Sequence, residues 1–346
     1  MLTDIFATRY LELKLWDGFA EQDRRLLVQS FRLLEEQICP YYVDSKESPA
    51  GKAFWTDLHN RISMEMGVTS LSPLVYTYGN SYTVTGMWPM NTVCQNWMLK
   101  SFEGTDDPDR FMKERLSLIE LGFRMKGEEI NAVNARLEAD ILAARLRPVR
   151  AGSIRIPGDI GDGMRAANAT INAGYQAVIS ELNARLRQAG CKLHYHNGFI
   201  QRANDTFSTD NIEAPFWSAV AGPIWTNVDT DMKEAFDGRD TGGRDPAFYA
   251  ARALESTIKI ISDGKSWTRG GERGAHNFID NLASKRAAFL IDWEADLLKT
   301  FFTKVRNPLG HGPGTQPMPS LSPEQTNWAI ETVMVWIKTL VRRSGL

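Results

Sequence analysis

Apolar residues spaced three and four apart, with charged residues between them, dominate the chain. This pattern covers residues 21–38, 109–147 and 163–189, for example in "ERLSLIELGF". Such spacing places the apolar side chains on one face of an α-helix. We therefore predict amphipathic helices in these three segments and a mainly α fold.

Three other segments break the helical pattern. Residues 66–95 are aromatic and interrupted by Gly and Pro, which predicts irregular structure or short strands. "KLHYHNGFIQR" at 192–202 places Asn197-Gly198 between two strand-like runs. Because Asn-Gly readily adopts two positive φ angles, this segment predicts a small β-hairpin. "AGSIRIPGDIGDG" at 151–163 predicts a linker between helices.

A compact helical unit is predicted after residue 225. Asp245-Pro246 is typical of a helix start and Asp263-Gly264 of a stop, so "AFYAARALESTIKIIS" is expected to be one helix. Its predicted apolar face consists of Ala247, Ala251, Leu254, Ile258 and Ile261. Its opposite face carries Arg252, Glu255 and Lys259, an arrangement also typical of a solvated helix surface.

Two further helices are predicted near the C-terminus. The first spans about 285–305 and ends at Asn307-Pro308, because proline disfavours the α region in the residue before it. Its stripe of Leu290, Trp293, Leu297, Phe301 and Val305 is expected to be buried. The second begins at "SPEQ", where Ser322 and Gln325 form a capping box.

The last helix carries apolar residues on two faces. Ile330, Val333, Met334, Ile337, Leu340 and Val341 form one stripe. Trp328 and Val335 lie on roughly the opposite side at about 100° per residue. We therefore expect a second buried face, which packs either on the N-terminal half of this chain or on a second copy.

At 346 residues the chain is long enough for two domains, at roughly 100–200 residues each. We predict an N-terminal, mostly helical accessory or sensor domain over 1–225. It contains the hairpin at 192–202 and a possible sub-boundary near 150–162. A C-terminal helical bundle is expected over 226–346.

Charge and cysteine usage restrict the partners and the compartment. Forty Lys and Arg oppose forty-two Asp and Glu, so a nucleic-acid or membrane partner requires a local patch. The first twenty residues lack the pattern of a secretion signal, and no eighteen-residue apolar stretch occurs in the sequence. Cys39, Cys94 and Cys191 lack the spacing of a zinc site or a disulfide framework. We expect a cytoplasmic protein without membrane contact.

The segment "KVRNPLGHGPG" at 304–314 combines side chains suited to phosphoryl chemistry. The guanidinium of Arg306 is a permanent fork-shaped donor for phosphate, and the imidazole of His311 can move protons near neutral pH. Asn307 can orient the imidazole or bind a phosphate oxygen. The structural alternative is that Arg306 complements the helix dipole and His311 caps carbonyl groups.

His194 and His196 alternate onto one face of the predicted hairpin and are candidate metal ligands. No carboxylate or third histidine lies nearby in the sequence. Two histidines without a third ligand form a weak motif, so the structural interpretation is favoured. We predict no metal and no cofactor.

Residues 229–346 resemble the HEPN superfamily, in its abortive-infection C-terminal type from bacterial anti-phage proteins. The resemblance rests on "AARALESTIKII" in one helix and on "VRNPLGHGPG" after a later one. The family signature is an arginine, a polar residue, a short spacer and a histidine. These positions correspond here to Arg306, Asn307, the spacer 308–310 and His311. The segment 163–202 is less specifically similar to the region that often precedes this domain.

The resemblance implies a helical domain that forms a homodimer and cuts RNA without metal. In such proteins the ribose 2′-hydroxyl attacks the adjacent phosphorus and leaves a 2′,3′-cyclic phosphate. His311 is then expected to act as general acid or base, Arg306 to stabilise charge on the phosphoryl oxygens, and Asn307 to hold the geometry. The family also suggests that Glu255 and Lys259, and more weakly Arg252, face the cleft and contact RNA.

Three hypotheses follow from the sequence. The first is an endoribonuclease effector of phage defence whose N-terminal domain binds a phage-derived or regulatory trigger. The second is a non-catalytic HEPN module that binds RNA, a nucleotide or a partner protein. The third is a metal hydrolase built on His194 and His196, which a chelator inhibits.

Overall fold

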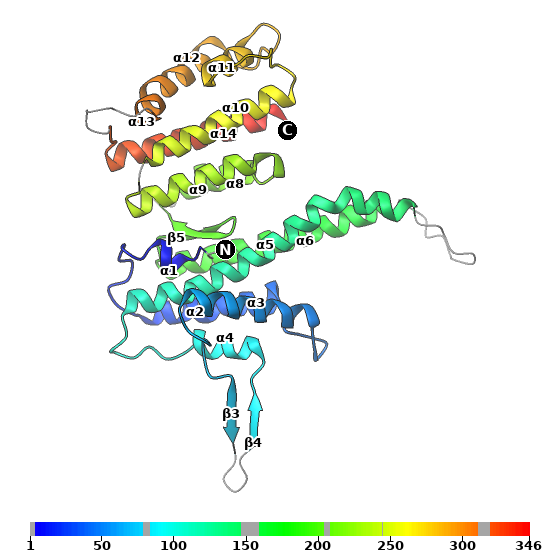
Figure 1. Cartoon of the computed structure of the whole chain (residues 1–346), viewed down its shortest axis with the longest axis vertical. Helices are drawn as coiled ribbons and strands as arrows, with labels where there is room; N and C mark the ends of the chain where they lie inside the picture. The colour runs from blue at the N-terminus through cyan, green and yellow to red at the C-terminus, as the bar shows by residue number, and fades with distance from the viewer. Residues whose placement is uncertain (1–3, 79–83, 147–158, 204–207, 244, 311–318) are drawn as a thin grey trace. The chain divides into compact units, whose positions relative to one another are not determined.

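The computed structural model describes residues 4–78, 84–146, 159–203, 208–243, 245–310 and 319–346 (Figure 1). The chain divides into two compact units, 1–200 and 201–346. Helices dominate both units, and the described strands form three separate two-stranded antiparallel hairpins. The prediction of a mainly α fold with a small β-hairpin is confirmed.

The first unit contains six α-helices among its described residues. They are α1 (Phe6–Arg9), α2 (Glu21–Arg32) with its π-helical continuation η1 (Leu33–Ile38), α3 (Pro49–Glu65), α4 (Met90–Met98), α5 (Pro108–Leu146) and α6 (Ile160–Gln188). The helices predicted over 21–38, 109–147 and 163–189 are therefore confirmed. Their apolar faces meet in one core around Phe31, Trp55 and Leu116.

Short hairpins connect these helices. Their strands are β1 (Tyr42–Val43) with β2 (Lys46–Glu47), β3 (Val75–Tyr78) with β4 (Val84–Met87), and β5 (Leu193–His196) with β6 (Phe199–Arg202). The segment 66–95 therefore contains short strands followed by the start of α4. Asn197 and Gly198 have φ angles of 41° and 97°, which confirms the Asn-Gly turn of the β5–β6 hairpin.

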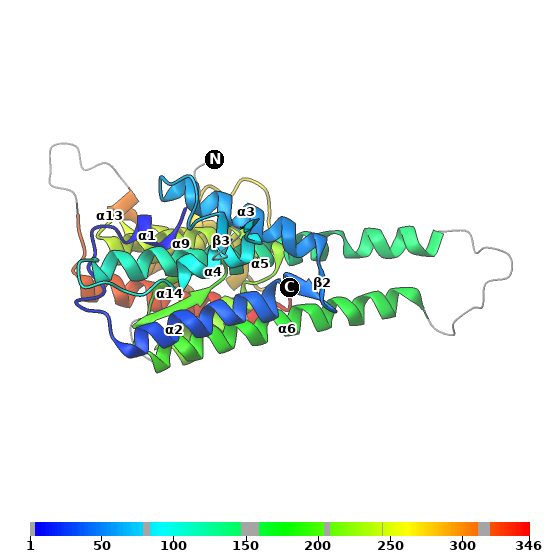
Figure 2. The same cartoon turned by 90° about the horizontal axis from the view of Figure 1, so that it is seen from below.

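The helices α5 and α6 lie side by side and extend beyond the rest of the first unit (Figures 1 and 2). Asn134 on α5 is hydrogen-bonded to Asn168 and Asn172 on α6, so polar side chains meet across the helix pair. The predicted linker at 151–163 lies mostly outside the described residues. Its last part begins α6, where the Asp159 side chain accepts a hydrogen bond from the Gly161 N–H.

The second unit is helical throughout its described part after β6. Its elements are η2 (Thr209–Glu213), α8 (Ala214–Ala219), η3 (Pro223–Trp225), α9 (Thr226–Thr241), α10 (Pro246–Gly264), α11 (Ala275–Ala283), α12 (Asp292–Phe301), η4 (Phe302–Arg306), α13 (Asn307–Gly310) and α14 (Pro323–Ser344). Phe216, Trp217 and Trp225 pack in the core of this unit. The second unit therefore includes residues 201–225, which were predicted to belong to the N-terminal domain.

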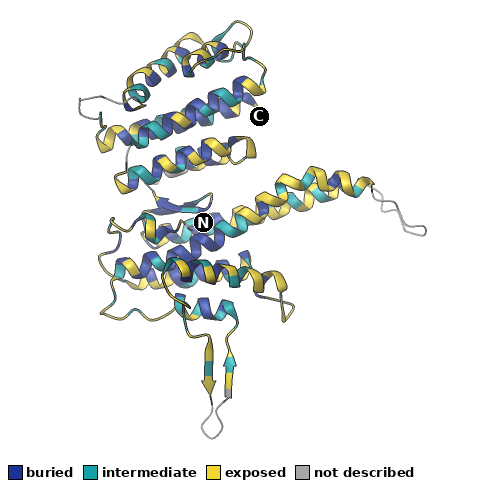
Figure 3. Ribbon diagram, viewed as in Figure 1, coloured by how far each residue is buried: buried dark blue, intermediate teal, exposed yellow. Residues whose placement is uncertain are grey.

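The central helix of the second unit is α10, which packs against α9, α11 and α14. All five residues of its predicted apolar face are buried. Figure 3 shows many buried residues where α10 and α14 overlap in the view. The predicted capping box of α14 is also present, because the Ser322 side chain accepts from the Gln325 N–H and the Gln325 side chain accepts from the Ser322 N–H. Periodicity therefore predicted the buried face of α10, and the capping box predicted the start of α14.

The predicted helix over 285–305 requires two corrections. The helix α12 begins only at Asp292, and Trp293 and Leu297 are 57% and 52% exposed. Ala295, Leu298 and Phe302 face the core instead. Leu290 and Phe301 are buried as predicted. The prediction was wrong for Trp293 and Leu297, because a short helix packed on one side can also carry apolar residues on its open face.

The predicted stop at Asn307-Pro308 was also wrong. Asn307 has α-helical angles, and the chain continues through the π-turn η4 into α13. The Asn307 N–H donates to the Phe302 carbonyl, five residues earlier, so the π-helical turn comes directly before Pro308. Proline has no N–H to donate, and the helix continues past it after this local change of hydrogen bonding.

The described residues contain no helix that is long and apolar enough to cross a membrane.

Candidate functional site

The "RNPLGH" segment begins where the π-helix η4 changes to the α-helix α13. Arg306 is the last residue of η4 and Asn307 the first of α13. His311, the predicted proton-transfer residue, lies outside the described residues. The structure therefore gives the surroundings of Arg306 and Asn307 only.

Arg306 lies against the polar face of α10. Its Nη2 is 3.4 Å from Oε2 of Glu255, and the other carboxylate oxygen of Glu255 is 2.8 Å from Nζ of Lys259. The buried Glu255 carboxylate thus lies between Lys259 on α10 and Arg306 at the end of η4, about fifty positions later in the sequence. We call Arg306, Glu255 and Lys259 the cationic cluster.

Aromatic and amide groups complete the surroundings of Arg306. The guanidinium carbon lies 5.6 Å from the centre of the Phe248 ring, and Nη1 lies 3.5 Å from Oδ1 of Asn307. The buried Nε of Arg306 has no hydrogen-bond partner among the described residues. The guanidinium therefore keeps hydrogen-bonding capacity that the described protein does not use.

Gly310 permits the close approach between α13 and α10. A Cβ atom at this position would lie 2.9 Å from the Phe248 ring and 3.5 Å from Nη1 of Arg306. The ring would have to move to admit any side chain here. The absence of a side chain at Gly310 therefore permits α13 to pack against α10.

The cationic cluster is partly open to solvent and carries one net positive charge. The Lys259 side chain is about half exposed, and Glu255 is largely covered. Two cations sharing one carboxylate can bind an anionic phosphodiester, because Glu255 neutralises only one of them. The arginine offers a fork of N–H donors and the lysine a point charge.

Arg252 belongs to a different interaction. It donates from Nε to Oδ1 of Asp231 on α9 at 2.9 Å, and this hydrogen bond raises the pKa of Arg252. The structure thus brings together Arg306, Asn307, Glu255 and Lys259, whereas Arg252 joins α9 to α10. Arg252 lies one helical turn before Glu255, but its side chain reaches Asp231 on α9.

Phe248 was not among the site residues predicted from the sequence. A signal was available, because Phe248, Arg252, Glu255 and Lys259 follow one another at spacings of four, three and four on one helix face. An aromatic ring on that face can support a guanidinium through a cation–π contact.

The histidine pair on β5 has a different environment. His194 is buried and His196 is partly covered. Across the described ranges, no group of three or more His, Cys, Asp and Glu side chains is arranged to hold a metal ion.

Cys39 is a poor candidate for a catalytic nucleophile. Burial raises the pKa of its thiol to about 11, which disfavours the reactive thiolate at neutral pH.

Comparison with known proteins adds a family assignment. Neither the curated proteins nor the solved structures include a match to this chain. The sequence pattern of AbiJ N-terminal domain 4 matches residues 4–218. This match covers more than half of the chain, including the first unit and the start of the second. The chain therefore belongs to the AbiJ N-terminal domain 4 family, which associates it with abortive infection, a form of defence against phage.

Proposed function

We propose that this protein is a metal-independent endoribonuclease of abortive infection, with a HEPN-like active site in its second unit. The observation that carries the proposal is the position of Arg306 beside Glu255 and Lys259, directly before the segment that leads to His311. A positively charged, partly open cluster whose arginine precedes a histidine by five positions in the sequence fits the requirements of phosphodiester cleavage.

In the proposed reaction the 2′-hydroxyl of one ribose attacks the adjacent phosphorus. The bond to the 5′-oxygen of the next nucleotide breaks, which leaves a 2′,3′-cyclic phosphate and a 5′-hydroxyl. His311 transfers a proton at the attacking or the leaving oxygen. Arg306 donates hydrogen bonds to the phosphoryl oxygens as negative charge grows on them.

The other cluster residues support these two groups. Lys259 contacts the phosphate as a point charge, and Asn307 holds the Arg306 guanidinium and the start of α13. Glu255 is a positioning residue, because it contacts both cations and fixes the distance between them. Arg252 has no part in the proposed reaction, because Asp231 engages it.

The proposal includes a homodimer through the second unit that places two such sites across one cleft. Trp328 and Val335 on α14 are exposed, as are Trp293 and Leu297 on α12. Contiguous apolar patches on a protein surface mark interaction sites, and these four side chains are proposed to form such a patch. The first unit is proposed to bind the phage-derived or regulatory trigger.

The test is incubation of the purified protein with total RNA in the presence of EDTA. The wild-type protein is expected to cut RNA, whereas Arg306→Ala is expected to be inactive. Arg286→Ala is the matched control, because Arg286 is an exposed arginine of the same unit. Binding of RNA without cleavage by the wild-type protein would favour the non-catalytic module, and cleavage lost on EDTA treatment would favour a metal hydrolase.

A further inference from the structure

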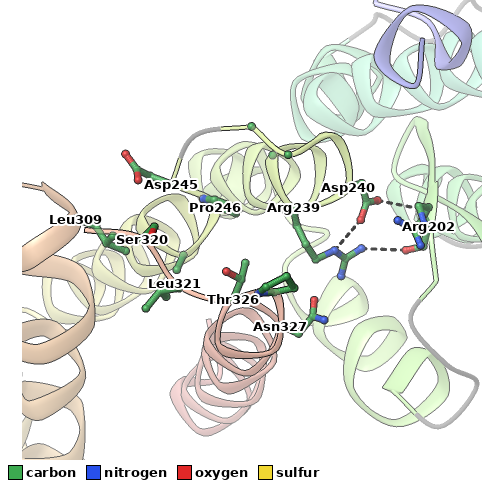
Figure 4. A pocket seen from close by; sticks show the side chains of 15 residues that line it. Arg202, Arg239, Asp240, Asp245, Pro246, Leu309, Ser320, Leu321, Thr326 and Asn327 are labelled. Carbon is green, nitrogen blue, oxygen red and sulfur yellow. Dashed lines mark hydrogen bonds and ion pairs between the residues drawn. The ribbon is translucent and has the colours of Figure 1, made fainter. Parts of the chain in front are cut away.

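A pocket of about 420 Å³ opens in the second unit, separate from the cationic cluster (Figure 4). The C-terminal end of α9 and the first turns of α10 and α14 surround it. Its apolar walls include Pro246, Ala247, Leu309, Leu321 and Pro323. The volume is in the range of small-molecule sites and exceeds what a single phosphate group requires.

Arg239 is the main polar group of this pocket. Its side chain is only 8% exposed. Nε donates to Oδ1 of Asp240 at 2.7 Å, and Nη2 donates to the carbonyl of Arg202 at 3.1 Å. The remaining nitrogen, Nη1, is buried without a hydrogen-bond partner in the described part of the chain.

Asn327 on α14 offers a second unsatisfied group in the same pocket. Its Oδ1 is buried and has no partner among the residues that the structure describes. Figure 4 shows Arg239 turned toward Asp240 and Arg202, with Asn327 below the guanidinium group in this view. Buried polar atoms in native proteins are normally satisfied by protein, water or ligand. One donor and one acceptor of the residues that line the pocket therefore lack a partner among the described residues.

The charge of the pocket disfavours a purely anionic ligand. Its two arginines, Arg202 and Arg239, are balanced by Asp240 and Asp245. A free phosphate would gain little net attraction there. A flat heterocycle that packs on apolar walls and both accepts and donates hydrogen bonds at its edge fits better. Nucleobases have this chemistry, and unpaired bases of RNA are recognised in this way.

The pocket borders the proposed active site. Leu309 and Ser320 line the pocket, and His311 lies between these two residues in the sequence. Pro246 and Ala247 line it from the first turn of α10, directly before Phe248, whose ring supports Arg306. A base in the pocket would thus lie next to a phosphate held by the cationic cluster.

We propose that this pocket holds one unpaired nucleobase of the RNA, adjacent to the phosphate that is cut. The inference rests on the proposed function and adds a specificity subsite to it. Arg239 donates to the base edge and Asn327 accepts from it. The apolar walls hold the two faces of the ring.

Calorimetric titration of the full chain tests the pocket without requiring cleavage. The ligands are the four ribonucleoside 5′-monophosphates, with ribose 5-phosphate as the ligand that lacks a base. Ser320→Trp closes the mouth of the pocket from an exposed position, and Asn327→Leu removes the acceptor. Ser320→Ala and Asn327→Asp are the matched controls. Arg239 is left unchanged, because its contacts to Asp240 and Arg202 also support the fold.

We expect at least one monophosphate to bind more tightly than ribose 5-phosphate. Both Ser320→Trp and Asn327→Leu are expected to weaken that binding tenfold or more, whereas the controls keep it. Equal binding of ribose 5-phosphate, or binding that neither variant changes, would overturn the inference even if the protein cuts RNA. A protein that binds the base as expected but never cuts RNA would instead overturn the proposed function, and with it the subsite role.

Mapping of cleavage ends provides the second readout. If the wild-type protein cuts RNA, one position next to the cut is expected to show a base preference that Asn327→Leu relaxes. Wild-type cleavage with no preference at any neighbouring position would contradict a base-reading subsite. Equal melting temperatures of Asn327→Leu and Asn327→Asp would show that the difference does not come from folding.

Discussion

Each unit pairs an arginine with a glutamate on a long helix. The two pairs differ in the number and length of their hydrogen bonds and in their exposure to solvent. In the first unit Arg9 makes two hydrogen bonds to Glu120, at 3.1 and 2.5 Å, with side-chain exposures of 7% and 0%. In the second unit Arg306 approaches Glu255 only to 3.4 Å, with exposures of 27% and 12%. The residue types are the same, but the second pair is looser and more open.

The surroundings explain this difference. Glu120 also accepts from the Ile200 N–H at 2.6 Å, and Arg9 donates to the Ile200 carbonyl, so the first pair ties α1 and α5 to β6. Glu255 shares its second oxygen with Lys259, which leaves the cationic cluster with a net positive charge. A closed pair stabilises the fold, whereas an open cationic one can bind a phosphate.

Removal of Glu120 is expected to have the largest effect on stability. Glu120→Ala removes the buried carboxylate of Arg9 and leaves the half-exposed Asp4 as its other acidic partner. Breaking a buried pair typically costs about 3–5 kcal/mol of the free energy of unfolding. Urea denaturation of the full chain measures the change. Asp57→Ala is the matched control, because the half-exposed Arg61–Asp57 pair is expected to contribute at most about 1 kcal/mol. Similar losses in both variants would contradict a structural role for the Arg9–Glu120 pair.

Arg306→Ala is expected to lower RNA cleavage strongly and to change the free energy of unfolding little. Loss of a donor to the developing phosphoryl charge typically lowers kcat about 10²–10³-fold. The unfolding free energy is expected to change little, because the partly exposed guanidinium makes only long contacts. Parallel measurement of RNA cleavage and urea denaturation tests this prediction. A variant that unfolds as readily as Glu120→Ala would place Arg306 among the structural residues.

Replacement of Glu255 tests positioning. Glu255→Gln keeps the size of the side chain but removes the charge that holds Arg306 and Lys259, so kcat is expected to fall on the order of 10–100-fold through misplacement of the guanidinium. KM is expected to change little, because both cations remain. A rise in KM without a change in kcat would assign Glu255 to substrate binding instead.

Charge on the exposed face of α14 tests the dimer. Val335→Asp is expected to shift the protein to monomers in light scattering at micromolar concentration and to lower RNA cleavage with it. A charged side chain at a buried interface is costly when it has no partner. Val335→Thr is the matched control without charge. A wild-type monomer with full activity would contradict the proposed two-site cleft.

The smallest effect is expected for Arg252→Ala. The half-exposed Arg252 pairs with Asp231 and lies outside the cationic cluster, so the loss is expected to stay within about 1 kcal/mol of unfolding free energy. RNA cleavage is expected to remain at the parental rate. A large loss of cleavage would mean that the polar face of α10 acts as a whole.

Local patterns predicted the fold better than they predicted the site. The α10 face and the α14 capping box depend on residues within a few positions of one another, so periodicity was sufficient for both. The exposure of Trp293 and Leu297 depends on which side of α12 has a neighbour, which local spacing does not encode. The helical angles of Asn307 depend on the π-turn before it.

The cationic cluster was predicted only in part for the same reason. Arg306 was identified from its own segment, and Glu255 and Lys259 from helix spacing together with the HEPN resemblance. Phe248 shares the helix face of Glu255 and Lys259, but its contact with Arg306 and the role of Gly310 depend on packing between α10 and α13, which local spacing does not encode. Arg252 shares the spacing of the cluster residues but contacts α9, because side chains three and four residues apart can turn to different neighbours.

The most direct test of the proposed function is the RNA end produced by the wild-type protein and by His311→Ala, with EDTA present throughout. The wild-type protein is expected to leave 2′,3′-cyclic phosphate and 5′-hydroxyl ends. His311→Ala is expected to lose about 10²–10⁴-fold in rate, the usual contribution of general acid–base catalysis. Its melting temperature and dimer are expected to be unchanged. Parental cleavage by folded His311→Ala, or products that carry 5′-phosphate and 3′-hydroxyl ends, would contradict the proposed active site.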